Sequence, residues 1–156
     1  MSRRHPGARH HSRQVALQVL YAFDLADRAR SGPRPSDEEA FDRVASNFDL
    51  PAGARVFARA LVRGTIACRS ELDAVLSTHA ENWRISRMAA VDRNILRLAC
   101  YELTRTDTPS SVVLDEAIEL ARRFGSDASP GFVNGVLDAV VRGSEVPGSA
   151  QAEVSR

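Results

Sequence analysis

The chain has 156 residues, of which 44% are hydrophobic, and a formal net charge of +1. This length predicts one domain, and the apolar content suffices for a single ordinary core. No apolar run approaches the ~18 residues of a membrane span, and the N-terminus lacks the apolar stretch of a secretory signal. We therefore expect a cytoplasmic protein without a membrane partner.

The first thirteen residues are compositionally distinct, because they hold four arginines, three histidines and no acid. The arginines contribute +4, which leaves −3 for residues 14–156. A basic arm on a mildly acidic body is typical of proteins that contact phosphate groups. An organelle transit peptide has a similar composition, but this segment continues directly into a helix pattern. We predict a flexible basic arm over residues 1–12.

Beyond the arm, apolar residues recur with the 3.6-residue period of helices. The first helix fades by Ala29, before a loop that contains glycine and proline. Ser36 and Glu39 have the spacing of a capping box and predict the start of the second helix. Pro51 opens a longer helical stretch, which Gly64 is expected to bend or divide.

The C-terminal half continues in the same way. Gly125 is expected to end an amphipathic helix in the left-handed conformation. Ser129 is predicted to cap the last helix, with Pro130 at its first position. We expect that helix to stop at Gly143, and the tail over residues 144–156 to be disordered.

Six or seven helices with short loops and no convincing strand predict an all-α fold, arranged as a compact bundle. Residues 13–143 are expected to form a single all-helical domain between the arm and the tail.

Side chains suited to catalysis or metal binding are few. Cys68 and Cys100 lie far apart among apolar neighbours, which predicts free thiols in a reducing compartment. No glycine-rich phosphate loop follows a strand. Gly131 and Gly135, four residues apart, are expected to allow close backbone packing. We predict a protein that is not an enzyme and that uses no metal and no cofactor.

Arg55, Arg59 and Arg63 recur every four residues and so share one helix face. Like charges at this spacing cost about a few tenths of a kcal/mol per pair. An RNA backbone, a partner subunit or acids within the fold would each offset that cost. The sequence leaves these alternatives open, and intramolecular pairing or plain solvation is the simplest of them.

Three segments carry the most specific signal in the chain. The first is RQVALQVLY, where the basic arm enters the opening helix, and the second is VDRNILRLACYEL. The third is the longest and most specific, EAIELARRFG followed by FVNGVLD. Together these segments resemble the NusB family of bacterial transcription antitermination factors, and the similarity covers roughly residues 9–142.

This resemblance implies an all-helical fold of two small helical bundles. It implies binding to the boxA sequence of nascent ribosomal RNA transcripts together with NusE, a ribosomal protein of the small subunit. The pair is then expected to join RNA polymerase and the other Nus factors in the elongation complex and to promote read-through. No reaction is catalysed. Family members occur as monomers and homodimers, so a homodimer is one expected state.

The resemblance also implies an RNA-binding surface around the arm and near residues 127–132. The residues that we expect to bind RNA are Arg3, Arg4, Arg9, His10, His11, Arg13, Gln18, Tyr21 and Phe132. Tyr21 and Phe132 are suited to stacking on bases, although each is also explained as a core residue. The sequence departs from the family at Gly131, a position often basic in relatives, and at His10 and His11, where arginines are common.

Two other interpretations stay open. The same fold occurs as the RNA-binding part of certain ribosomal RNA cytosine methyltransferases, and the chain would then be a stand-alone relative of that part. A helical adaptor that binds only protein is the other alternative, in which the basic arm merely improves solubility. RNA binding at moderate salt distinguishes an RNA-binding protein from such an adaptor.

Overall fold

The computed structural model describes the backbone of residues 7–29, 33, 36–80 and 83–154. Of these residues, it describes side chains only up to residue 143. Over these residues the chain forms helices and turns and no strand, which confirms the all-α prediction. The helices are α1 (Ala8–Ala29), α2 (Asp37–Ala45), α3 (Ala52–Ala67), α4 (Arg69–His79), α5 (Ala90–Arg105), α6 (Ser110–Phe124) and α7 (Ser129–Val154), with a 3-10 turn η1 (Ile85–Arg87) before α5. No helix among the described residues is long and apolar enough to cross a membrane.

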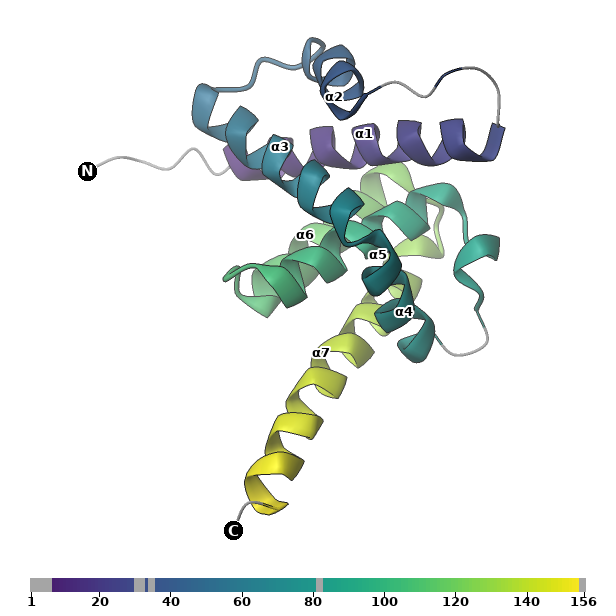
Figure 1. Ribbon diagram of the computed structural model, residues 1–156, viewed down its shortest axis with the longest axis vertical. Coiled ribbons are helices and arrows are strands. Elements are labelled where there is room, and N and C mark those ends of the chain that lie inside the picture. The colour runs from purple at the N-terminus through teal and green to yellow at the C-terminus, as the bar shows by residue number, and fades with distance from the viewer. Residues whose placement is uncertain (1–6, 30–32, 34–35, 81–82, 155–156) are drawn as a thin grey trace, which may run out of the picture. The chain divides into compact units, whose positions relative to one another are not determined.

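The chain divides into two compact units, residues 1–69 and residues 70–156. In the first unit, α1 packs against both α2 and α3 (Figure 1). Its core includes Val15, Val19 and Phe23 of α1, which are almost fully buried, as their helical spacing predicts. The predicted cap of α2 is also present, because the Ser36 hydroxyl accepts a hydrogen bond from the Glu39 amide at 3.2 Å.

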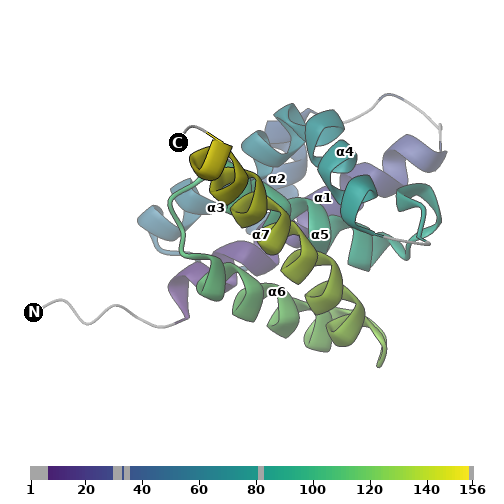
Figure 2. The ribbon, with the colours of Figure 1, turned by 90° about the horizontal axis from the view of Figure 1, so that it is seen from below.

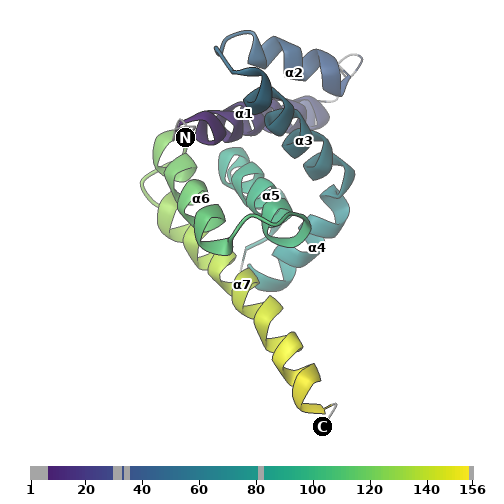
Figure 3. The same cartoon turned by 90° about the vertical axis from the view of Figure 1, so that its left-hand side faces the viewer.

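The second unit is built around α5, α6 and α7, which pack against one another (Figures 2 and 3). Leu120 on α6 and Leu137 on α7 are at most 2% exposed. The Arg97 guanidinium of α5 donates two hydrogen bonds to the Asp73 carboxylate of α4, at 2.8 and 2.9 Å. This two-point pair connects α4 to the packed helices and satisfies a guanidinium that is almost completely buried.

Two helix ends differ from the sequence prediction. Helix α1 begins at Ala8, so residues 8–12 are helical and do not belong to a flexible arm. Helix α7 continues past Gly143 to Val154. A Cβ atom at residue 143 would lie 2.4 Å from the His79 imidazole, so this glycine leaves room for the His79 side chain of α4 beside α7. The division into arm, domain and tail otherwise stays a prediction.

The connection between α6 and α7 also differs. Gly125 ends α6 with φ −94° and ψ −167°, which is extended, so the predicted left-handed cap is wrong. The reason for glycine is space, because a Cβ atom here would lie 2.5 Å from the Ser129 side chain. Ser129 is itself the first residue of α7, and its hydroxyl accepts from the Ser126 amide at 2.9 Å. Helix α7 therefore begins one residue earlier than predicted, with Ser129 inside the helix and not before it.

Candidate nucleic-acid interface

The first two turns of α1 carry the best-defined cationic site of the first unit. Arg9 is exposed, and its guanidinium carbon lies 4.2 Å from the centroid of the Phe57 ring on α3. The guanidinium carbon of Arg13, four residues later, lies 5.3 Å from the same centroid. Arg13 is only 3% exposed, so a direct contact with RNA requires its side chain to be released.

Ser12 fixes this end of α1 to α3. Its buried hydroxyl lies 2.8 Å from the Ala54 carbonyl oxygen on α3 and 2.9 Å from that of Ala8, and it can donate to either. Because Phe57 follows Ala54 by about one turn, this contact fixes the ring beside α1.

The two histidines of this segment differ in burial. The His10 ring is half-buried, and its Nε2 lies 3.0 Å from the side-chain nitrogen of Gln14, one turn later. The His11 ring is exposed, and the two imidazole centroids are 6.1 Å apart. Both rings therefore add polar nitrogen atoms to the segment that carries Arg9.

Further along α1, His11, Gln18 and Tyr21 follow at spacings of seven and three residues and so share a helix face. Gln18 is half-buried, and Tyr21 is 36% exposed. Leu25 continues this face and is 44% exposed. Tyr21 is thus exposed and not a core residue.

In the second unit, Phe132 lies in the first turn of α7 beside Trp83. The two rings meet edge to face, with centroids 5.2 Å apart and an interplanar angle of 64°. Both line an open groove of about 610 Å³. Trp83 is 56% exposed, which is unusual for so large an aromatic side chain.

Gly131 and Gly135 also line this groove. A Cβ atom at either position would meet nothing within 4 Å, so the expected close backbone packing at these glycines is wrong. The small residues instead leave the groove open beside the two rings. Arg142 also lines the groove and forms an ion pair with Asp138.

Arg93 holds the turn that begins two residues after Trp83. Arg93 is 2% exposed, and its guanidinium donates to the Met88 carbonyl at 2.8 Å and to the Ile85 carbonyl at 3.3 Å. These hydrogen bonds connect α5 to the η1 turn.

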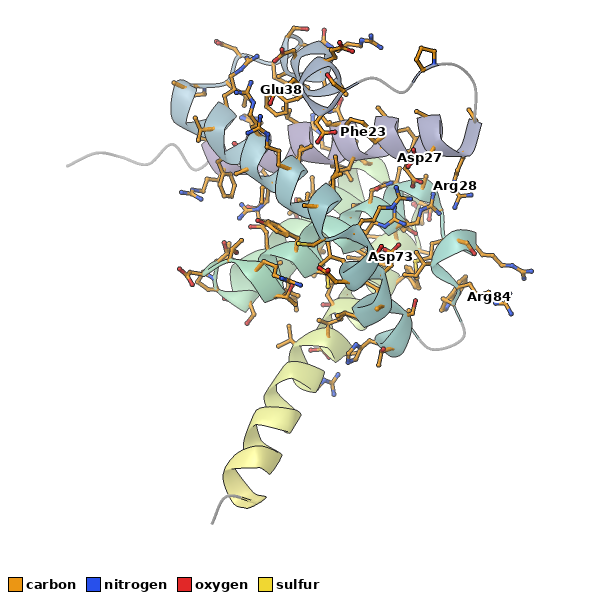
Figure 4. All side chains as sticks on the ribbon, in the orientation of Figure 1. Phe23, Asp27, Arg28, Glu38, Asp73 and Arg84 are labelled. Carbon is orange, nitrogen blue, oxygen red and sulfur yellow. The ribbon has the colours of Figure 1, made fainter. Side chains whose placement is uncertain are left out.

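The arginine stripe on α3 pairs with acids of α2. Arg55 lies 3.3 Å from Asp42, and Arg59 lies 3.6 Å from Asp42 and 3.5 Å from Glu38. Arg63 pairs with Glu38 as well. Glu38 is labelled on α2 in Figure 4. Among the alternatives that the sequence left open, intramolecular pairing is therefore the one observed.

The structure separates the predicted RNA-binding residues into distinct groups. Arg3 and Arg4 lie outside the described residues. Arg9, His10, His11, Arg13, Gln18 and Tyr21 all lie on α1, in the first unit, and Phe132 lies in the second. Sequence reasoning missed Phe57 and Trp83. The signal for Trp83 is that it is the sole tryptophan and stands outside any apolar periodic pattern; Phe57 looks like an ordinary core residue.

Groups with chemical reactivity are sparse. Burial raises the pKa of the Cys100 thiol to about 11, so this sulfur stays protonated and unreactive at neutral pH. Within the described part of the chain, no three histidine, cysteine or acidic side chains are grouped as a metal site would require.

An all-helical protein with guanidinium groups on its first helix, and with the Trp83 and Phe132 rings lining an open groove of its second unit, has the features of small RNA-binding regulators. The comparison with known proteins narrows this class. The NusB family model matches residues 10–142, and the chain belongs to the NusB family.

Similar proteins include the transcription antitermination protein NusB of Solibacter usitatus, which is 45% identical over 95% of this chain and 98% of its own length. NusB of Geobacter sulfurreducens is 44% identical over 86% of this chain and 94% of its own. The chain is thus a transcription antitermination protein of this family.

Solved structures agree with this assignment. NusB of T. maritima superposes with a TM-score of 0.72 and 34% identity, covering 86% of this chain and 90% of that one. The NusB chain in a crystal structure of antitermination factors NusB and NusE in complex with dsRNA gives a TM-score of 0.75 and 27% identity, covering 88% of this chain and 98% of that one.

Proposed function

We propose that this protein binds boxA RNA of nascent ribosomal RNA transcripts together with ribosomal protein NusE. The assembly then acts on the elongation complex of RNA polymerase and the other Nus factors and promotes read-through. The protein works in the cytoplasm and catalyses no reaction. The solved assembly of NusB, NusE and dsRNA supports both partners, because its NusB chain matches almost in full.

The observation that carries this proposal is the environment of Arg9. This side chain is exposed, and no acid among the described residues forms an ion pair with it. Its charge is therefore available to a phosphate group, unlike the charges of the α3 stripe. Arg3, Arg4, His10 and His11 would add to the same field, which is sequence-independent. Gln18 and Tyr21 would extend the contact along α1.

Phe132 and Trp83 would supply a second contact of a different kind. Flat rings at an open groove stack on unpaired bases, which is how single-stranded RNA is commonly recognised. Phosphate contacts position the RNA, whereas base contacts discriminate between sequences. Replacing Phe132 by alanine should therefore reduce the preference for boxA over an unrelated RNA more than it reduces total affinity.

Sedimentation of the pure protein with boxA RNA and with NusE, separately and together, tests the proposal. We expect a complex that contains all three components and that forms more weakly on an RNA with a scrambled boxA. The run without partners also distinguishes a monomer from a homodimer. A complex with NusE that excludes RNA would overturn the proposal and identify a protein-binding adaptor instead.

A further inference from the structure

Phe57 is an unusual neighbour for a basic segment that binds RNA. The ring is half-buried on α3, and two guanidinium groups of α1 lie over it, at 4.2 Å for Arg9 and 5.3 Å for Arg13. Both distances are within the ~6 Å at which a cation is attracted to the face of an aromatic ring. Sequence periodicity alone assigns Phe57 to the core.

The ring is held in place by packed helices. Helices α1 and α3 pack directly against each other, and the Ser12 hydroxyl reaches the Ala54 carbonyl of α3 at 2.8 Å. Arg9 precedes Ser12 by three residues, and Phe57 follows Ala54 by three. The contact between Arg9 and Phe57 therefore lies one turn from a fixed point on both helices.

Stacking on a ring and binding a phosphate use different parts of a guanidinium group. The ring contacts the flat face, whereas the N–H groups point outward in the plane and form paired hydrogen bonds with phosphate oxygens. A carboxylate partner would occupy those N–H groups, but a ring leaves them free. Holding the side chain before RNA arrives also lowers the entropy lost on binding.

We propose that Phe57 is a positioning residue that holds the Arg9 guanidinium so that its N–H groups face an RNA phosphate. This inference rests on the RNA-binding function proposed above. It assigns Phe57, which does not itself contact RNA, a role in affinity through Arg9.

Two substitutions distinguish the effect of the aromatic face of Phe57 from the effect of its apolar volume. Phe57→Leu keeps an apolar side chain and removes the aromatic face, whereas Phe57→Tyr keeps the face. We expect Phe57→Leu to weaken RNA affinity about two- to five-fold, the scale of an exposed cation–π contact, and Phe57→Tyr to retain wild-type affinity. Phe48→Leu is the matched control, since Phe48 is a half-buried phenylalanine of the same unit whose ring has no arginine over it in the described part of the chain.

A double-mutant cycle distinguishes positioning from a general structural effect. If Phe57 acts through Arg9, Phe57→Leu has no further effect on RNA affinity in an Arg9→Ala background. An equal loss in both backgrounds, or no loss in either, would overturn the inference. The salt and NusE concentrations are kept constant throughout.

A second measurement needs no RNA. In the free protein, NMR should show the Arg9 side-chain protons shifted by the ring current of Phe57, and this shift should disappear in Phe57→Leu and persist in Phe57→Tyr. If wild type does not bind RNA even with NusE, the proposed function fails and the inference fails with it, whatever the shifts. If wild type binds RNA and the shifts are absent, the inference alone fails.

Discussion

The first unit contains two places where a pair of arginines lies over a phenylalanine ring. Arg9 and Arg13 lie over Phe57, while Arg55 and Arg59 lie over Phe41, with guanidinium carbons 5.7 and 5.0 Å from the ring centroid. In both, the arginines are spaced by four residues on one helix. The side-chain chemistry is therefore the same at the two sites.

Their surroundings differ. At Phe41, Asp42 of α2 forms ion pairs with both arginines, and Glu38 forms one with Arg59. At Phe57, the exposed Arg9 has no ion pair with an acid of the described residues. The Phe41 cluster links α2 to α3, whereas the Phe57 cluster is the one that we propose presents its charge to RNA. Which arginines are available thus depends on the helix that packs beside them.

The two rings should also differ in their contribution to stability. Phe41 is 1% exposed, so Phe41→Ala should lower the free energy of unfolding by about 3–5 kcal/mol through loss of buried area and the resulting cavity. Phe57 is only half-buried, so the same change, Phe57→Ala, should cost less. Urea denaturation of both variants measures this difference. Equal losses would mean that Phe57 is a core residue like Phe41.

Removing the acids should make the two clusters alike. The double variant Glu38→Gln/Asp42→Asn leaves the α3 arginines without carboxylate partners. RNA binding should become stronger, without preference for boxA, and the slope of log K against log salt should steepen by up to about 2 for the three arginines.

The variant Asp37→Asn/Glu39→Gln controls for this change. It alters the charge of α2 by the same amount, but neither side chain forms an ion pair within the described structure. If both double variants steepen the slope equally, net charge rather than local pairing determines which arginines bind RNA.

Helix periodicity was sufficient to predict the all-α fold and much of the core, because the apolar face of a helix is encoded locally. Phe23 and Leu120 are buried as their spacing predicts. The Ser36 cap was also predictable, since both partners lie within one turn.

Contacts between helices were not predictable in the same way. The pairing of Arg59 with Glu38 joins residues 21 apart in the chain, and nothing in either helix alone indicates it. The same holds for Phe57, whose partner Arg9 lies on another helix. Trp83 is exposed although its size suggests burial, and Gly125 is required by the Ser129 side chain and not by its own φ angle.

The most direct test of this account compares the salt dependence of boxA RNA affinity in two single variants, Arg9→Ala and Arg59→Ala, each with NusE present. Both remove one arginine that lies over a phenylalanine ring. We predict that the slope of log K against log salt becomes shallower by about 0.7 in Arg9→Ala, as expected for one lost phosphate contact on a single strand, and does not change in Arg59→Ala. An unchanged slope in Arg9→Ala together with a shallower one in Arg59→Ala would contradict the account and locate the RNA-binding surface on α3.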